Sequence, residues 1–270
     1  MKLYKTDYHN LSKEDRKVWK ELEDAEIVYR DGKPTMIRNS LYHEFPKSAR
    51  HYMSLFPNNF IDAVDLTKIS AELHATLSQF EILLEKPDTT ERHILNFLRD
   101  EEAYFIVGSL LKKDYRFGHH ALFIFPEFNM PPSYKADYLL VGENSDGHHF
   151  VFVEFENVYG DITVKNGDYG KTIRKGIKQI DDWEFWLEKN FSHLELVFES
   201  SKNKSKLLPD EFRGFDRTRI HYVIVAGRRK DYSERTYRLR RSNRDQRKLS
   251  IIHYDNLVDY AKATIGTSIY

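Results

Sequence analysis

The chain has 270 residues, of which 42 are Lys or Arg and 42 are Asp or Glu, so its formal net charge is zero. It contains no cysteine, which excludes disulfides, thiolate metal sites and cysteine nucleophiles. The first residues lack the apolar core of a signal peptide, and the longest apolar run, residues 103–111, is too short to span a membrane. The composition therefore predicts a cytoplasmic protein with no membrane association.

Residues 1–85 are predicted to form a small α+β region of their own. Strands are expected at residues 25–29 and 34–39, on either side of a turn at residues 30–33. Apolar side chains at three- and four-residue spacings predict one helix over residues 65–85. This region carries no recognisable catalytic or binding motif, so its role could be specificity, assembly or sensing.

Lys86-Pro87-Asp88 ends that helix and marks a predicted domain boundary, with residues 86–270 forming the second domain. Thr89 or Thr90 is expected to cap the next helix. Glu91 lies in its first turn, where stabilisation of the helix dipole is the simplest explanation for an acid. Helical structure is expected to continue over residues 102–111, and a strand to follow at residues 121–128.

Residues 135–157 predict a β-hairpin. A first strand at residues 136–142 runs into a polar turn, and a second strand follows at residues 149–157. Because side chains alternate along a strand, Glu154 and Glu156 share one face. Asp137 lies across from Glu154 or from Glu156, and either register places it on that same face.

Three carboxylates on one face of a hairpin need an explanation. Two of them about 5 Å apart repel by roughly 3 kcal/mol at an effective dielectric constant near 20. Either the acids extend into water at the margin of a sheet, or something neutralises them. A divalent cation such as Mg²⁺ or Mn²⁺ would do so, because Mg²⁺ binds one or two carboxylates together with phosphate oxygens of a substrate.

A helix is predicted over residues 171–190, directly after the acid-bearing strand and a loop. Lys171, Lys175 and Gln179 lie on one polar stripe of this helix. Such a stripe is usually the solvent face. Its position after the acidic strand also allows the first half of the helix to lean over the carboxylates.

The remaining elements predict an extension of the sheet. Strands are expected at residues 194–199, 219–226 and 249–253, and helices at residues 233–246 and 256–263. A buried strand, a helix and a second strand in this order predict a β-α-β unit.

The segment of residues 228–248 is strongly basic, with ten Lys or Arg and three Asp or Glu. Arg238, Arg241 and Arg244 can share one face of the predicted helix. This face is either simply solvated or a contact surface for the phosphates of a nucleic acid. Elsewhere the sequence has no Gly-x-Ser-x-Gly motif, no P-loop and no dinucleotide-binding fingerprint after a strand, which argues against serine hydrolases, NTPases and Rossmann oxidoreductases.

An acid in one hairpin strand, followed by acid-x-Lys or acid-x-acid in the next, resembles the pattern of the PD-(D/E)xK nuclease superfamily. Here the pattern is Asp137, then Glu154-Phe155-Glu156. The segments around these acids point to one family within the superfamily. In chain order they are TERHILNFL, Pro126-Glu127, KADYLL, KQIDDW, VIVAGR and IHYDNL. Together, residues 86–270 resemble the nuclease-like domain of Shedu anti-phage defence proteins.

The resemblance implies an α/β fold with a restriction-endonuclease-like mixed β-sheet flanked by helices. It implies a metal-dependent DNA endonuclease or nickase in antiviral defence, forming homo-oligomers, with a possible phage-derived trigger acting at the N-terminal region. By matching positions, Asp137 and Glu154 would be metal ligands and Glu91 an accessory ligand. Gln179 would orient water or phosphate.

One position departs from the motif, because Glu156 stands where the lysine is expected. Glu156 could act as a general base or bind a second metal. Alternatively, Lys171, Lys175 or Lys165 could supply the missing positive charge. In a third outcome the site is inactive, and the domain is a nucleic-acid-binding or assembly module. We assign Glu156 and Lys171 to the catalytic set, and Lys175 to nucleic-acid contact together with the three arginines.

Overall fold

The computed structural model describes residues 2–36 and 40–270. Its centre is a five-stranded mixed sheet with the strand order β3-β4-β5-β6-β7. The strands are β3 (Ala121–Met130), β4 (Tyr134–Asn144), β5 (Gly147–Phe155), β6 (Ile220–Val225) and β7 (Leu249–Ile252). β3, β4 and β5 pair antiparallel, whereas β6 and β7 run parallel to β5. The predicted mixed α/β sheet is confirmed.

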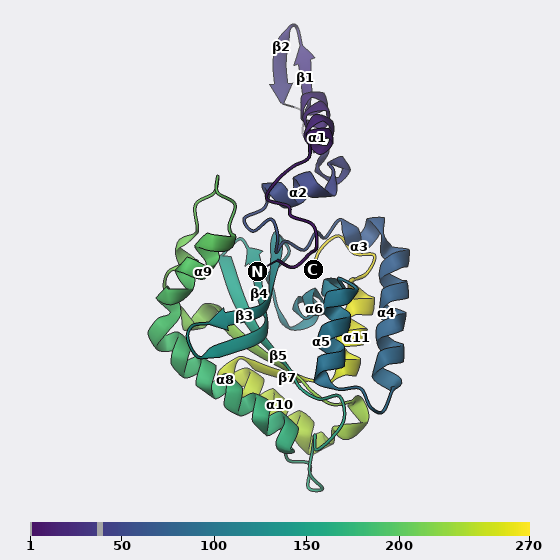
Figure 1. The fold of residues 1–270 in the computed structure, drawn as a ribbon, viewed down its shortest axis with the longest axis vertical. Helices are drawn as coiled ribbons and strands as arrows, with labels where there is room; N and C mark the ends of the chain where they lie inside the picture. Colours follow the sequence, from purple (N-terminus) through teal and green to yellow (C-terminus); the bar gives the residue numbers. More distant parts are fainter. Residues whose placement is uncertain (1, 37–39) are drawn as a thin grey trace.

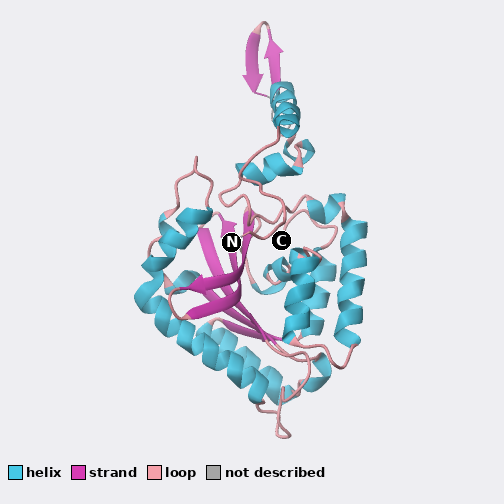
Figure 2. Ribbon diagram, in the orientation of Figure 1, coloured by secondary structure: helices cyan, strands magenta, loops and turns pink. Residues whose placement is uncertain are grey.

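Helices cover both faces of this sheet (Figures 1 and 2). One face is covered by α8 (Lys171–Asn190), α9 (Leu194–Ser201) and α10 (Glu234–Arg247). The other is covered by α4 (Ser70–Glu85), α5 (Glu91–Asp100), α6 (Tyr104–Gly108), α7 (Leu111–Asp114) and α11 (Tyr254–Thr264).

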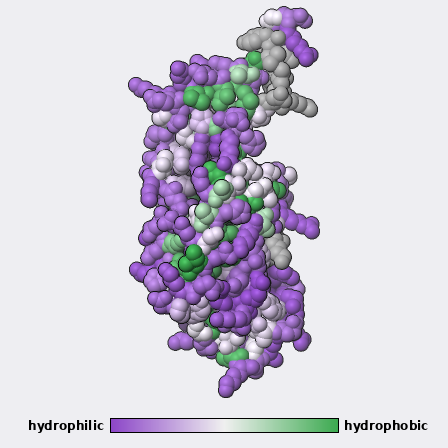
Figure 3. All heavy atoms as spheres, turned by 90° about the vertical axis from the view of Figure 1, so that its right-hand side faces the viewer, coloured by the Kyte–Doolittle hydropathy of each residue, from purple (hydrophilic) through white to green (hydrophobic). Residues whose placement is uncertain are grey.

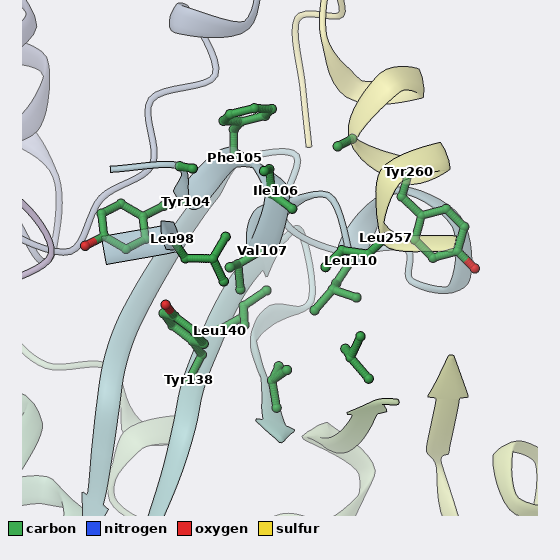
Figure 4. Packing of buried hydrophobic residues seen from close by; sticks show 14 of the residues in the cluster. Leu98, Tyr104, Phe105, Ile106, Val107, Leu110, Tyr138, Leu140, Leu257 and Tyr260 are labelled. Atoms are coloured by element: carbon green, nitrogen blue, oxygen red, sulfur yellow. The ribbon is translucent and has the colours of Figure 1, made fainter. Parts of the chain in front are cut away.

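Each face has its own hydrophobic cluster, because alternate side chains of a strand point to opposite sides. Val151 and Val153 of β5 join the cluster under α5, α6 and α11, whereas Phe150 and Phe152 join the cluster under α8. Figure 4 shows part of the first cluster, where side chains of α5, α6, β4 and α11 meet. Leu77 of α4 lies in the same cluster, so residues on both sides of position 86 share one core. The domain boundary at residue 86 stays a prediction.

The N-terminal elements extend from this body. They are α1 (Lys13–Glu26), β1 (Ile27–Arg30), β2 (Lys33–Met36), α2 (Lys47–Met53) and α3 (Asp65–Lys68). α1 and the hairpin β1–β2 stand away from the sheet at the top of Figure 1, and α1 buries no residue. Short 3-10 helices occur at Tyr42–Glu44, Phe191–His193, Asp210–Phe212, Arg217–Arg219 and Arg229–Asp231.

Several boundaries follow the predictions. The helix over residues 171–190 begins and ends where it was expected, and Thr90 caps α5 by accepting a hydrogen bond from the His93 backbone N–H. β6, α10 and β7 form the predicted β-α-β unit with parallel strands.

Other predictions are wrong for identifiable reasons. The strand expected at residues 194–199 is helix α9, because Leu194 and Phe198 are buried at a four-residue spacing, which is helical. The single helix expected over residues 65–85 is divided at Ile69, whose backbone leaves the helical region. Glu102 has a φ of 48°, which ends α5 and starts the short helices α6 and α7 instead of one long helix.

The hairpin near the N-terminus is only partly as expected. Its first strand starts at Ile27, because α1 runs on to Glu26. The prediction missed α1 altogether, although the side chain of Ser12 caps this helix and gives a sequence signal for it. Of the strand expected at residues 34–39, residues 37–39 lie outside the described residues.

The side of the molecule that carries α4 is mostly hydrophilic, with small separate apolar patches (Figure 3). In the described ranges, no helix combines the length and the apolar character that crossing a bilayer requires.

Candidate functional site

The hairpin β4–β5 brings the predicted acids together. Tyr138 pairs with Val153, so the next positions outward, Asp137 and Glu154, lie opposite each other. This is the first of the two registers that the sequence allowed. Oδ2 of Asp137 accepts a hydrogen bond of 2.7 Å from the backbone N–H of Phe155, which fixes the carboxylate against β5.

Glu154 and Glu156 are buried to an unusual degree for glutamates, with exposed fractions of 4% and 1%. They lie on the face covered by α8, because they share the parity of Phe152. One oxygen of each carboxylate, Oε2 of Glu154 and Oε1 of Glu156, is buried without a hydrogen-bond partner among the described residues. Unpartnered buried polar atoms are rare in native proteins and call for an explanation.

This environment shifts the acids toward their neutral forms. Burial raises the pKa of Glu154 to about 10, and the nearby carboxylates of Asp137 and Glu156 add to the shift. Burial raises the pKa of Asp137 to about 7, although the hydrogen bond from Phe155 opposes it. The pKa of Glu156 is also raised by burial, with Lys175 acting in the opposite direction. The fold therefore holds these acids where a positive charge would be strongly favoured.

One positive charge is already present. Nζ of Lys175 donates a hydrogen bond of 2.9 Å to Oε2 of Glu156 and lies 3.8 Å from Oε2 of Glu91. Burial alone would lower the pKa of this lysine, but its contacts with the two glutamates raise it. Helix α8 approaches the sheet closely here because residue 176 is glycine; a Cβ atom there would lie 3.1 Å from a side-chain carbon of Ile224.

Glu91 adds a fourth carboxylate from the other face of the sheet. It is the first residue of α5, and its backbone N–H donates a hydrogen bond of 3.3 Å to Oδ1 of Asn157. This contact ties the start of α5 to the segment that follows β5. The carboxylate of Glu91 contacts Lys175. Glu91 is therefore both an acid in the first turn of a helix, where it stabilises the helix dipole, and a member of the acidic cluster.

The other predicted residues of α8 lie in line with Lys175. Lys171 is exposed one turn earlier, and its backbone N–H donates a hydrogen bond of 3.0 Å to Oδ2 of Asp161. Gln179 is partly buried one turn later, and its side chain makes no hydrogen bond within residues 2–36 and 40–270. Lys165 is exposed in the preceding loop. Of the three lysines considered from the sequence, Lys175 contacts an acid of the hairpin.

The basic helix α10 lies at the edge of the sheet, beside β7. Arg238 is exposed, while Arg241 pairs with Glu234 at 3.0 Å. Arg241 and Arg244 line a hollow of about 290 Å³ together with Arg240. Arg238 does not line this hollow, so the three predicted arginines present two adjoining surfaces.

One participant was missed from the sequence. Tyr254, the first residue of α11, is fully buried and donates a hydrogen bond of 2.6 Å to the backbone oxygen of Glu156. It holds the end of the acidic strand in place. The buried apolar stripe of α11 gave no sign that its first residue reaches back to the hairpin.

The acids fit a small, hard cation by chemistry, since all the donors are carboxylate oxygens and two are unpartnered. Within the described part of the chain, however, no three His, Cys, Asp or Glu side chains stand in an arrangement that would hold a metal ion. Magnesium needs only one or two protein carboxylates, because water and phosphate oxygens complete its coordination. Asp137 and Glu154, opposite each other on the hairpin, are the residues that would hold it.

The fold and the site thus define a class: an α/β protein with a mixed sheet and a buried carboxylate cluster at the open end of its central hairpin. Residues 88–258, more than half of the chain, match the family model described as Shedu protein SduA, C-terminal. The chain belongs to this family. Membership suggests a role in anti-phage defence. No curated protein matches the chain.

Proposed function

We propose that this protein is a divalent-metal-dependent DNA endonuclease or nickase that acts in anti-phage defence. The observation that carries the proposal is the pair of buried, unpartnered carboxylate oxygens of Glu154 and Glu156 beside Asp137, in a domain of the Shedu family. Carboxylates with raised pKa values in such a cluster are typical of functional sites. Cytoplasmic location and assembly into homo-oligomers remain predictions.

In the proposed reaction, the oxygen of a water molecule forms a bond to phosphorus while the bond from phosphorus to the leaving sugar oxygen breaks. Asp137 and Glu154 would hold Mg²⁺ or Mn²⁺, which supplies Lewis-acid polarisation of the phosphate and lowers the pKa of water. Oε1 of Glu156 accepts the proton of the attacking water, and its raised pKa makes it a stronger base than an ordinary glutamate carboxylate. The leaving oxygen takes a proton from solvent.

Lys175 provides the positive charge that the motif lysine would otherwise supply. Its ammonium group lies beside Glu156, the residue that replaces that lysine. Oriented there, it stabilises negative charge that develops on the phosphate. Gln179, one turn farther along α8, is placed to orient water or phosphate.

The test is cleavage of supercoiled plasmid with Mg²⁺ or Mn²⁺. Asp137→Ala and Glu154→Ala should abolish cleavage, whereas Asp210→Ala, which removes a fully exposed acid, should not change it. Failure of the wild-type protein to cut with either metal, or full activity of both variants, would refute the proposal.

A matched pair of lysine variants tests the role of Lys175. Lys175→Ala should lower kcat about 100-fold, the lower end of the range for a single charge-stabilising or proton-transferring group. Lys189→Ala removes the same charge in the last turn of α8, far along the helix from the carboxylates, and should leave kcat unchanged. An equal loss of kcat in the two variants would indicate that α8 acts through its net charge and not through the position of Lys175.

The second candidate function is a nucleic-acid-binding or assembly module without catalysis. It is favoured by the glutamate at position 156, where the motif has a lysine. It is also favoured by the ion pair in which Lys175 already neutralises the carboxylate of Glu156. This module would bind DNA without metal and would keep that binding in Asp137→Ala.

A further inference from the structure

Among the described residues, one hollow at the edge of the sheet is lined by three arginines and by no Asp or Glu. It has a volume of about 290 Å³ and lies beside β7, the last strand of the sheet. Arg240, Arg241 and Arg244 of α10 form one wall, and Ser250 of β7 and Asn256 of α11 also line it. The helix before β7 and the helix after it thus meet this strand around one space, which we call the arginine hollow.

Its charge differs from that of the hollow beside the acidic cluster. That hollow, of about 500 Å³ and bounded in part by residues 2–5, is lined by both acidic and basic side chains. In the arginine hollow, Arg241 pairs with Glu234 at 3.0 Å and Arg244 with Asp245 at 3.5 Å, but both acids are exposed and lie outside the hollow. Exposed ion pairs contribute little free energy, so an anion that enters the hollow can replace these acids.

Arg240 is held in the hollow by contacts with neutral groups. It is half-buried, and within residues 2–36 and 40–270 it pairs with no acid. Its Nη1 donates a hydrogen bond of 3.4 Å to Oδ1 of Asn256, and its Cζ lies 5.3 Å from the centre of the Tyr237 ring. These contacts orient the planar guanidinium group without using Nε or Nη2, which can donate to the oxygens of an anion.

A buried hydroxyl group faces the same need for a partner. Ser250 is 8% exposed and lines the hollow, yet its side chain makes no hydrogen bond in the part of the chain that the structure describes. Buried polar side chains normally have a partner. The side-chain nitrogen of Asn256 is also available as a donor, because the oxygen of this amide is the atom that accepts from Arg240. An oxygen-rich ligand would satisfy both groups.

The charge and size of the arginine hollow favour a phosphate monoester. A monoester has three terminal oxygens and about 1.5 to 2 negative charges at neutral pH, which suits three guanidinium groups. A phosphate within a nucleic-acid backbone carries one charge. The volume lies just below the range of about 300–1,000 Å³ that is typical of pockets for drug-sized molecules, so the ligand is small.

We propose that the arginine hollow binds the terminal phosphate group of a small molecule. Arg240 and Ser250 contact the phosphate oxygens, and the exposed Arg241 and Arg244 add charge at the entrance. The site shares no residue with the acidic cluster and does not depend on the proposed nuclease function. Inorganic phosphate presents the same chemistry and serves as the first probe.

Binding is measured by calorimetric titration of the full chain with inorganic phosphate at constant ionic strength. Arg240→Gln and Ser250→Ala should each weaken binding about 10-fold, the effect of losing one hydrogen bond to a charged group. Arg238→Gln is the matched control, because it removes the same charge from the same helix outside the hollow, and it should leave the phosphate affinity unchanged. Equal losses in Arg240→Gln and Arg238→Gln would overturn the proposal.

A second measurement uses the wild-type protein, so it does not depend on the folding of a variant. Phenylglyoxal modifies arginine side chains, and mass spectrometry of peptides reports the rate at each position. Phosphate at 10 times its dissociation constant should slow the modification of Arg240 about 10-fold, because about nine-tenths of the sites are then occupied. The rate at Arg238 should not change. Equal protection of the two arginines would indicate general screening of α10 and overturn the site.

A matched pair of ligands tests the preference for a monoester. Adenosine 5′-monophosphate and adenosine 3′,5′-cyclic phosphate share a base and a sugar, but the second is a diester with one negative charge. The monoester should bind about 10-fold more tightly, since it offers an additional charged acceptor to the arginines. Equal affinity would overturn the terminal phosphate as the recognised group. Inorganic phosphate that binds as tightly as the monoester would support the site and identify free phosphate as a sufficient ligand.

The outcomes are independent of plasmid cleavage. A wild-type protein that cuts plasmid but shows neither heat of phosphate binding nor protection of Arg240 overturns this proposal and leaves the nuclease intact. Binding and protection as expected, without any cleavage, support the phosphate site and overturn the nuclease.

Discussion

Two groups of buried charges in this protein differ in how completely they are balanced. In the N-terminal region, Nε of Arg50 donates to Oδ2 of Asp62 at 2.6 Å, and both side chains are almost fully buried. Lys47 and Asp65 adjoin them, so two cations meet two acids. At the open end of the hairpin β4–β5, Lys175 pairs with Glu156 and Glu91, whereas Asp137 and Glu154 pair with no cation within residues 2–36 and 40–270.

The difference separates a structural cluster from a functional one. A balanced group with its hydrogen bonds made holds the fold in one arrangement. An unbalanced group costs stability and leaves polar atoms without partners, which the fold tolerates where a ligand completes the arrangement. The acids of the hairpin are therefore the better candidates for function, although the N-terminal cluster is just as deeply buried.

The largest expected effect comes from a substitution that breaks the balanced cluster. Arg50→Met leaves Asp62 buried without its cation and should lower the free energy of unfolding by about 3–5 kcal/mol, measured by urea denaturation. Lys175→Met is the matched change in the acidic cluster. It should cost less than about 1 kcal/mol, because the lysine side chain is 58% exposed and Glu156 can become neutral by binding a proton. A larger loss for Lys175→Met would reverse the comparison.

Metal binding should complete the unbalanced cluster. Mg²⁺ or Mn²⁺ at about 100 times its dissociation constant should add about 2.7 kcal/mol of stability and raise the melting temperature of the EDTA-treated protein. Asp137→Asn should lose this increment, whereas Asp62→Asn should keep it despite a lower starting stability. Calorimetric titration of wild type and of Glu156→Lys with Mg²⁺ or Mn²⁺ shows whether Glu156 contributes to metal binding. A titration of wild type without any heat of binding would contradict the metal site.

The acidic cluster should also make stability fall as pH rises. Between its ordinary value of 4.5 and about 10, Glu154 binds a proton in the folded chain that it has lost in the unfolded chain. Folded protein then holds more protons, so the free energy of unfolding decreases with increasing pH in this range. Asp137, with its pKa raised from 3.8 to about 7, acts in the same direction at lower pH.

Glu154→Gln checks this dependence without changing the shape of the side chain. Measured in EDTA, it should be more stable than wild type by about 2 kcal/mol at neutral pH and should show a flatter profile of melting temperature against pH. Identical profiles for the two proteins would show that the Glu154 carboxyl is not protonated in the folded chain at neutral pH.

The smallest expected effect concerns charges on the surface. Arg238→Glu combined with Arg241→Glu should weaken DNA binding about fivefold, or about 1 kcal/mol, since exposed charges are screened by solvent and Arg241 already pairs with Glu234. Filter binding at two salt concentrations measures it. No change in affinity would leave α10 as a solvated helix.

Much of the central architecture could be predicted because its signals are local. The hairpin, α8 and the β6-α10-β7 unit each carry their own periodicity and turn signals. The errors fell where a single backbone position decides the outcome, as at Ile69 and Glu102, or where a short apolar run fits either a strand or a helix, as in α9.

The sequence by itself determined that Asp137, Glu154 and Glu156 share one face of a hairpin, because the alternation of side chains along a strand depends only on spacing. The tertiary structure decided how deeply these acids are buried, which lysine reaches them, and that the N-terminal segment bounds the adjoining hollow. These features depend on the packing of α8, α5 and residues 2–5 around the sheet. Contacts between segments so far apart in the chain leave no periodic signal in the sequence.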